Sequence, residues 1–302
     1  MLQINLRHCK AATHQLTAKL AALQYGVALV QEPWVVNGRV RGFAGNDLVV
    51  YQPTCDRPRT CIVTTGNVTA QLAGGINDMD ITGVFVDYRH GGTDKRALFI
   101  SSYMAMTPGT HPPSQELEEA VRYGKHVHAP ILIGCDSNAH HYLWGSRNVN
   151  RRGTTLSEYI VNENLDIMNQ GDTDTFVTFN GSSVIDITLA TPDMSNHVKR
   201  WRVLLEDSLS DHRSREKWGF WHSNFCAQPS RTPPDPPRIL GVTHRLIRKL
   251  IRHLHWVVVD VAHSTPVCNS KFCGQPSQAL GVSRVLELTC RLIRKLEFLA
   301  DI

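Results

Sequence analysis

Short apolar runs recur along residues 1–213, and several of them end in polar side chains. The run at 129–133 passes directly into "GCDSNAHH" (134–141), and "LQIN" and "ALVQE" end in an amide and a carboxylate. Apolar runs of roughly four to eight residues bounded by turn residues predict buried strands. A packed set of such strands brings its polar ends to one edge. The pattern therefore predicts a β-rich scaffold with a polar site at the strand ends.

The remaining segments set the fold class. Helical spacing predicts helices at 11–24, 114–127 and 154–165, and Ser114 is the expected N-cap of the second. Strands are expected at 2–6, 25–34, 47–52, 60–65, 80–88, 97–104, 129–138, 165–169, 175–180, 183–191 and 201–206. Many strands and few helices in mixed order favour an α/β (α+β) protein of packed sheets over a βαβ repeat. The sequence contains neither GxGxxG after a strand nor a GxxxxGK[ST] loop, which disfavours nucleotide-cradling folds.

Charge and composition indicate in which compartment the protein is expected and where along the chain its basic residues lie. The chain has 302 residues and a net charge of +5, but residues 1–213 hold 19 Lys and Arg against 21 Asp and Glu. Residues 214–302 hold 13 against 6, so the basic excess lies there. The sequence has no apolar stretch of roughly 18 residues and no secretory signal pattern, so neither a membrane span nor secretion is expected. Eight cysteines without a CxxC pair predict free thiols in a reducing compartment.

Residues 214–302 differ in composition from the rest of the chain and are predicted to form a separate part. A Pro-rich segment at 227–241 predicts a linker, and "RLIRKL" occurs at both 245–250 and 291–296. Three interpretations of this basic amphipathic tail stay open. It forms solvated helices, it contacts nucleic acid or a membrane surface, or it is not a selected fold.

The polar residues at the predicted strand ends form a set suited to a metal. The set comprises Asn5, Glu32, Asp136, Asn138, Asp186, Asp211 and His212. Taken singly, Glu32 before proline is typical of a turn, and Asp136 is typical of a helix cap. The prediction of a metal site therefore rests on the whole set. Clustered carboxylates repel one another, and Mg²⁺ (or Mn²⁺), with its preference for oxygen ligands, relieves that repulsion. Asp186 lies within the apolar run "VIDITLA" and needs a buried partner.

Eight motifs in order resemble a known family. They are "LQINLRHCKAATHQL", "VALVQEPWV", "ISSYM", "ILIGCDSNAHHYLWGS", "NRRGTTLSEYI", "DTFVTF", "SSVIDITLAT" and "LSDHR". Together they resemble the apurinic/apyrimidinic endonuclease-like domain of non-LTR retrotransposons, within the endonuclease/exonuclease/phosphatase superfamily. The resemblance spans about residues 2–213. It implies a four-layered α/β sandwich of two mixed sheets flanked by helices, and a metal-dependent endonuclease acting on double-stranded DNA.

The resemblance also implies a role for each matching residue. Glu32 matches the metal-binding acid, with Asn5 beside it and Asp211 next to the metal or nucleophile network. Asp136 matches the residue that orients or deprotonates the attacking water, and Asn138 its partner on the scissile phosphate. In the same way, Tyr103 matches a phosphate-contacting tyrosine, Asp186 the residue that orients the catalytic histidine, and His212 that histidine.

Contacts to DNA are expected from a further group of residues. Arg151 and Arg152 suit phosphate contacts, although solvated loop arginines fit the sequence equally well. His140 is a candidate DNA contact, whereas Trp144 is interpreted as a packing residue. Thr175, Ser182 and Ser183 flank strands that approach DNA in relatives. Element RNA, held in a ribonucleoprotein, is a further candidate partner, and the family implies action in the nucleus and otherwise a cytoplasmic location.

One segment departs from the family pattern. After "SDH" relatives continue into an apolar strand, whereas this chain reads "RSREKWGFWHSNF" (213–225), a poor strand. A missing strand would cost several kcal/mol of a total of about 5–15 kcal/mol, and a truncated or frameshifted element would explain it. An inactive truncated product therefore stays open beside the endonuclease. The site chemistry alone also permits a phosphomonoesterase or phospholipid phosphodiesterase of the same fold.

Overall fold

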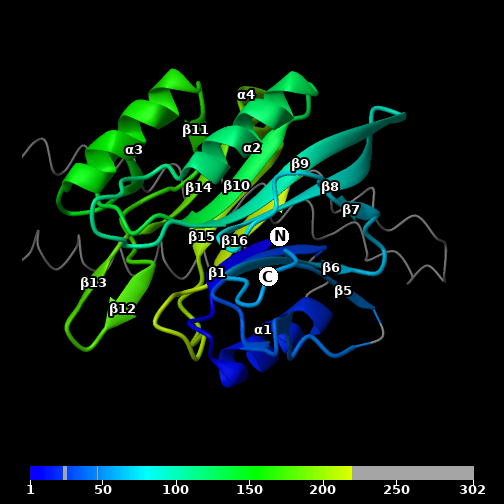
Figure 1. The fold of residues 1–302 in the computed structure, drawn as a ribbon, viewed down its shortest axis with the longest axis horizontal. Coiled ribbons are helices and arrows are strands. Elements are labelled where there is room, and N and C mark those ends of the chain that lie inside the picture. The colour runs from blue at the N-terminus through cyan, green and yellow to red at the C-terminus, as the bar shows by residue number, and fades with distance from the viewer. Residues whose placement is uncertain (23–25, 46, 220–302) are drawn as a thin grey trace, which may run out of the picture. The chain divides into compact units, whose positions relative to one another are not determined.

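The computed structural model describes residues 1–22, 26–45 and 47–219, all of which lie in one compact unit, Met1–Gln228. In this part of the chain, two six-stranded mixed sheets pack face to face, with helices on their outer faces (Figure 1). The predicted fold class, a four-layered α/β sandwich, is confirmed. Among the described residues, no helix combines the length and apolar character that crossing a bilayer requires.

The first sheet has the order β15-β16-β1-β2-β6-β5. Its strands are β1 (Leu2–Asn5), β2 (Val27–Gln31), β5 (Leu48–Tyr51), β6 (Thr60–Thr65), β15 (Val198–Val203) and β16 (Arg215–Gly219). β1 and β2 are parallel, so Asn5 and Gln31 lie at the same edge of the sheet. Helix α1 (Lys10–Ala22) covers the outer face with Ala12, Leu16 and Leu20.

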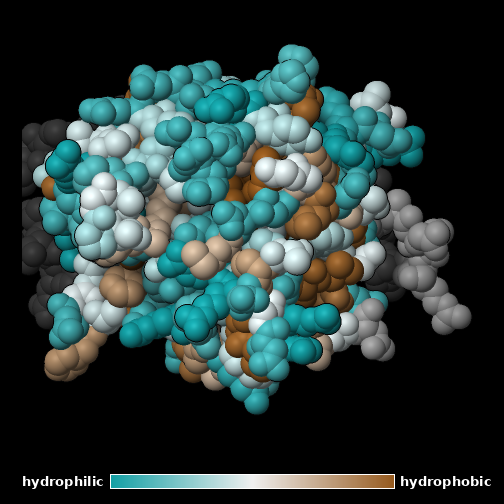
Figure 2. All heavy atoms as spheres, in the orientation of Figure 1, coloured by the Kyte–Doolittle hydropathy of each residue, from teal (hydrophilic) through white to brown (hydrophobic). Residues whose placement is uncertain are grey.

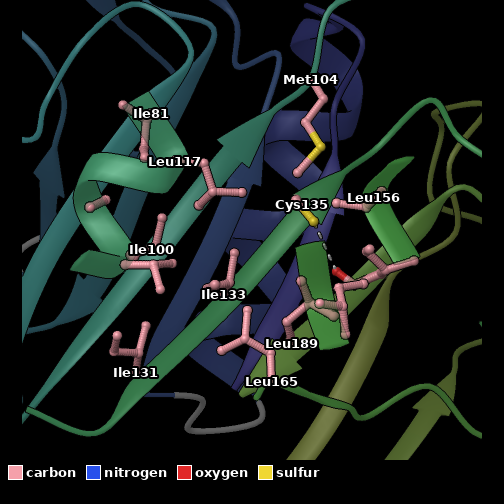
Figure 3. Packing of buried hydrophobic residues seen from close by; sticks show 14 of the residues in the cluster. Ile81, Ile100, Met104, Leu117, Ile131, Ile133, Cys135, Leu156, Leu165 and Leu189 are labelled. Atoms are coloured by element: carbon pink, nitrogen blue, oxygen red, sulfur yellow. Dashed lines mark hydrogen bonds between the residues drawn. The ribbon is translucent and has the colours of Figure 1, made fainter. Parts of the chain in front are cut away.

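The second sheet has the order β11-β14-β10-β9-β8-β7. Its strands are β7 (Ala70–Leu72), β8 (Ile81–His90), β9 (Thr93–Tyr103), β10 (Ile131–Asp136), β11 (Asp166–Ile167) and β14 (Asp186–Ala190). Helices α2 (Gln115–His126) and α3 (Arg151–Asn162) cover it, and the short α4 (Pro192–Ser195) follows β14. Figure 3 shows Leu117 of α2 and Leu156 of α3 over Ile133 and Leu189 of the sheet. Ser114 caps α2 as predicted, accepting a hydrogen bond from Leu117 N–H.

Two buried glutamines lie between the inner faces of the two sheets and hydrogen-bond across from one sheet to the other. Gln3 Nε2 donates to the carbonyls of Cys135 and Ile187, and Gln31 Nε2 donates to that of Gly134 at 3.0 Å. Buried amides need such partners, because an unpaired one costs roughly 1–3 kcal/mol. These bonds tie β1 and β2 of the first sheet to β10 of the second. The polar ends of these three strands are therefore held beside one another.

Short elements surround this edge. A hairpin of β12 (Phe176–Thr178) and β13 (Gly181–Ser183) projects beside it, and β3 (Val35–Val36) pairs with β4 (Arg39–Val40) after β2. A 3₁₀ turn, η1 (Tyr142–Trp144), precedes α3. The face in Figure 2 is mostly hydrophilic, but the tip of the β12–β13 hairpin is apolar, where Phe179 is fully exposed.

The expectation of a poor strand at 213–225 was wrong for its first part. β16 pairs with β15 on one side and β1 on the other, so the sheet is complete to Gly219. Charged residues are tolerated there because they have partners: Arg215 binds Asp186, and Glu216 binds Arg202. Helix α3 begins at Arg151, after the Asn150 N-cap, and not at 154. The Pro-rich linker and the amphipathic repeats lie outside the described residues, and the division of the chain near 213 stays a prediction.

Candidate functional site

Three strand ends meet through the side chain of Asn5. Its Nδ2 donates to Glu32 Oε2 at 2.9 Å and to Asp136 Oδ2 at 2.8 Å, and its Oδ1 accepts from Arg7 N–H at 2.8 Å. Asn5 ends β1, Glu32 follows β2, and Asp136 ends β10. One amide thus holds a carboxylate from each sheet. The juxtaposition predicted for these three residues is present.

The backbone around Glu32 is bent to present its carboxylate. Glu32 has φ of 44°, and Arg7 and His8 also lie in the left-handed region that costs non-glycine residues energy. Backbone bonds hold the turn, from Glu32 N–H to Arg59 O at 2.7 Å and from His8 N–H to Glu32 O at 2.7 Å. Partial burial opposes ionisation of Glu32, but hydrogen bonds from His8 and Asn5 outweigh it and lower the pKa of this carboxyl. Glu32 is therefore held as an anion.

Asp186, His212 and Arg215 form a buried ionic cluster. Asp186 Oδ2 lies 2.9 Å from His212 Nδ1 and 3.0 Å from Arg215 Nη1, and both Asp186 and Arg215 are fully buried. Burial alone would favour a protonated Asp186, yet Arg215 and His212 lower the pKa of this carboxyl. Burial likewise disfavours a charged His212, but Asp186 overcomes it and raises the pKa of the imidazole. The partner that the sequence demanded for Asp186 is thus His212 together with Arg215.

Asp136 is the carboxylate poised between its two protonation states. It is 2% exposed, and burial, followed by the charge of Asp186, raises its pKa to about 6. His212 Nε2 lies 3.8 Å from Asp136 Oδ2, so the histidine bridges the two acids. Asp136, Asp186 and His212 present ligand atoms within 4.8 Å of one another, an arrangement that can bind a metal ion.

An open cleft of about 400 Å³ lies over these groups. Glu32 and His212 line it, together with Asn138, which has φ of 46° and donates from Nδ2 to Met104 O at 3.3 Å. Asp211 also lines it and forms an ion pair with Arg7 across the opening. The β12–β13 hairpin forms one rim, because Phe176 pairs with His212 as an isolated bridge and its ring lies 4.8 Å from the imidazole.

Tyr103 ends β9 beside β10 and lies close to the acids. Burial and the carboxylates of Glu32 and Asp136 raise the pKa of its phenol, so it stays a neutral donor. The Arg59 guanidinium lies 5.1 Å from the centre of its ring. The structure therefore gathers all eight residues predicted for the metal and catalytic roles around one edge; their individual roles stay predictions.

The residues predicted to bind DNA divide into two groups. Ser183 and His140 line the cleft, and Arg151 is exposed at the start of α3. Arg152 instead points inward and donates to four backbone carbonyls, including those of Asn138 and Met104, which supports the loop after β10. Its predicted phosphate contact stays a prediction.

Thr175 also holds the backbone beside the cleft. It is fully buried, and its hydroxyl accepts hydrogen bonds from the N–H groups of Ile185 and Asp186 at 3.2 and 3.1 Å. It therefore positions β14, and its predicted contact to DNA stays a prediction. Ser182 donates to Asp174 at the hairpin base. Trp144 is buried, with its indole N–H on Ala139 O, as its interpretation as a packing residue requires.

Sequence reasoning missed three charged residues of the site. Arg215 lay in a segment judged too polar for a strand, although a buried Asp186 already required a cation. Arg7 and His8 come two and three residues after the end of β1, so the rule that polar residues at strand ends mark the site could have selected them as well. His8 Nε2 lies 3.5 Å from Glu32 Oε1, and its Nδ1 lies 3.0 Å from Pro33 O.

Comparison with known proteins finds a family model that matches part of the chain and solved structures with a similar fold. Residues 97–216 match the family described as endonuclease-reverse transcriptase. The endonuclease domain of TRAS1, a telomere-specific non-LTR retrotransposon, is 28% identical, with a TM-score of 0.59 over 71% of this chain and 94% of that one. No curated protein sequence matches the chain significantly.

Two more distant structures share the fold alone. The AP endonuclease LMAP from Leishmania major is 11% identical, with a TM-score of 0.53 over 72% of this chain and 87% of its own. The 3'-5' exonuclease NExo from Neisseria meningitidis is 14% identical, with a TM-score of 0.51 over 73% of this chain and 100% of its own. The described residues therefore have the fold of the endonuclease/exonuclease/phosphatase superfamily, and the resemblance to the endonuclease domains of non-LTR retrotransposons that the sequence predicts is confirmed.

Proposed function

We propose that this chain is a Mg²⁺-dependent endonuclease that nicks double-stranded DNA by hydrolysing a phosphodiester, as in non-LTR retrotransposition. One observation carries the proposal. Asn5 joins the carboxylates of Glu32 and Asp136 beside the His212–Asp186 pair, and Glu32 and His212 of this group line one open cleft. This arrangement supplies a cation site, a base and a positive group around one phosphate-sized position.

The donor set fits a hard divalent cation. Glu32 is held ionised and lines the cleft, and Glu32 and Asp136 offer carboxylate oxygens, while Asn5 Nδ2 donates to both carboxylates and holds them side by side. Asp186 is less suited, because its Oδ2 is already shared by His212 and the buried Arg215. We therefore assign Mg²⁺ (or Mn²⁺) to Glu32, with Asn5 and Asp136 beside it and Asp211 at the opening. When bound, the cation neutralises charge on the phosphate as the transition state forms.

The other groups perform the proton and charge steps. Asp136, whose pKa is near 6, accepts a proton from water as the water oxygen attacks phosphorus; the P–O bond to one sugar breaks, and the departing sugar oxygen takes up a proton from solvent. Asp186 holds His212 Nδ1, so the protonated imidazole directs Nε2–H to a phosphate oxygen and stabilises its growing charge. Tyr103 and Asn138 donate hydrogen bonds to the same phosphate. This division of roles follows from the opposite pKa shifts of Asp136 and Asp186.

DNA is the proposed substrate because of the relative and the shape of the site. TRAS1 is a non-LTR retrotransposon, and the present cleft is open and bordered by an exposed hairpin. His140, Ser183 and Arg151 are proposed to contact the duplex beside the cleft. The same relative supports two further proposals: partnership with element RNA in a ribonucleoprotein, and action in the nucleus.

A substrate panel tests the proposal. The full chain and its Glu32→Gln variant are incubated with supercoiled plasmid, p-nitrophenyl phosphate or phosphatidylinositol vesicles, with Mg²⁺, Mn²⁺ or EDTA. We expect conversion of plasmid to the open circle with either metal, none with EDTA or Glu32→Gln, and no turnover of the other two substrates. Turnover of the monoester or the lipid without nicking would contradict the proposal.

A further inference from the structure

A second cleft adjoins the catalytic cleft where His8 contacts Glu32. Its volume is about 680 Å³, and it is lined by segments 34–38 and 56–59 with His8 and Met79. His8 separates the two clefts: it lines the second, while its Nε2 lies 3.5 Å from Glu32 Oε1, which faces the first. The neighbouring Arg7 lines the catalytic cleft. The two clefts are therefore neighbours, joined at the His8–Glu32 contact.

The charges of this second cleft suit a phosphate. Arg57 is exposed, and within residues 1–22, 26–45 and 47–219 no ion pair engages it. Arg59 is paired with Asp80, and its guanidinium stacks 5.1 Å from the Tyr103 ring, so it links this cleft to the catalytic tyrosine position. Asp56 is the opposing acid in the wall. Arg57 is therefore the cation available to a ligand.

Trp34 supplies an aromatic surface in the same wall. It is partly exposed and lines the cleft. Lys10 Nζ lies 5.1 Å from its ring centre, and His14 meets it edge-on at 6.3 Å, so its orientation is fixed by neighbours on α1. An indole held in place beside an available cation is a combination that binds a base and its phosphate.

We propose that this cleft binds the nucleotide flanking the scissile phosphate, with its base on Trp34 and its phosphate on Arg57. The inference rests on the proposed DNA nicking and extends it to a second subsite on the substrate strand. The subsite adds binding free energy without touching the reacting atoms, since His8 and Glu32 stand between them. Loss of the subsite therefore weakens DNA binding and leaves the chemical step intact.

Four full-length variants test the subsite. Binding of a fluorescein-labelled duplex is measured by anisotropy in EDTA, and plasmid nicking in Mg²⁺ gives KM and kcat separately. Trp34→Ala and Arg57→Ala should each raise Kd and KM about tenfold, with kcat changed less than about twofold. Trp34→Phe should restore most of the binding, because its ring still stacks. Arg122→Ala, which removes an exposed arginine of α2, is the matched control.

The outcomes separate the subsite from the nicking activity. Nicking and DNA binding by Trp34→Ala and Arg57→Ala that equal those of the unmodified chain would overturn the subsite and leave the endonuclease standing. If the unmodified chain binds DNA but does not nick it, and both variants bind DNA more weakly, the subsite would be supported and the endonuclease activity refuted. A loss in kcat alone, or an equal loss with Arg122→Ala, would overturn the subsite. Circular dichroism melts identify a variant that has lost its fold. If Trp34→Ala is unfolded, DNA binding by Trp34→Phe tests the subsite in its place: binding close to that of the unmodified chain supports it, and binding about tenfold weaker overturns it.

Discussion

Replacing Asp136 by Asn is expected to stabilise the protein while abolishing hydrolysis. Burial and the charge of Asp186 raise the pKa of Asp136 from 3.8 to about 6. A shift of about two units corresponds to roughly 3 kcal/mol by which the ionised carboxylate destabilises the folded state near neutral pH. Asn keeps one acceptor and loses the bond from Asn138 N–H, at a cost of about 1 kcal/mol. The variant should therefore gain about 2 kcal/mol in its free energy of unfolding.

The size of the stabilisation expected for Asp136→Asn depends on pH. Below the unfolded-state pKa, Asp136 carries a proton in both states and costs nothing; the penalty grows as pH rises through the folded-state pKa of about 6. The gain should thus appear at about pH 8 and vanish near pH 4.

Thermal and urea unfolding of the full chain measure this difference. For a domain of this size the gain corresponds to roughly 5 °C in Tm. Asp172→Asn, at an exposed acid, is the control. A gain of equal size at both pH values, or an Asp136→Asn variant less stable than the unmodified chain near pH 8, would refute the reasoning.

Three further changes probe the rest of the site. Arg215→Met should destabilise the fold by about 3–5 kcal/mol in urea unfolding, because it leaves the buried Asp186 without its cation. Adding Asp186→Asn should recover part of that loss, and a double variant no more stable than Arg215→Met alone would argue against the ion pair. Millimolar Mg²⁺ should raise the Tm of the unmodified chain but not of Glu32→Gln, as ligand binding to the folded state requires; an equal rise in both would place the cation elsewhere. Thr175→Val should lower kcat while the Kd for duplex DNA stays unchanged, since Thr175 holds β14 and is buried; weaker DNA binding would support its predicted contact.

Sequence alone predicted the fold and most of the site because both follow simple rules. Short apolar runs with turn residues between them predicted most strands of both sheets but not β7 or β16, and spacing and caps predicted α1, α2 and α3 but not the short α4. Asn5, Glu32 and Asp136 were selected because polar residues end buried strands, and the structure joins them through one amide. Asp186 was selected because a carboxylate inside an apolar run requires a partner.

The errors arose where tertiary contacts override local pattern. "RSREKW" has poor strand character, yet β16 forms, because Asp186 neutralises Arg215 and Arg202 neutralises Glu216. The direction of a side chain is also invisible in the sequence. Arg152 and Thr175 were selected as DNA contacts, and the structure shows that both also hydrogen-bond to the backbone beside the cleft, while their contacts to DNA stay predictions. The second cleft was missed because its walls come from separate segments.

Nicking of supercoiled plasmid by His212→Ala tests the central claim most directly. The full chain, the variant and a His111→Ala control at an exposed histidine are compared with Mg²⁺ and with EDTA, after circular dichroism has shown that each is folded. The proposed role of His212 predicts Mg²⁺-dependent nicking by the first and third proteins and a rate about 10²–10⁴-fold lower for His212→Ala. Equal nicking by all three, or nicking that persists in EDTA, would contradict the proposed site and its chemistry.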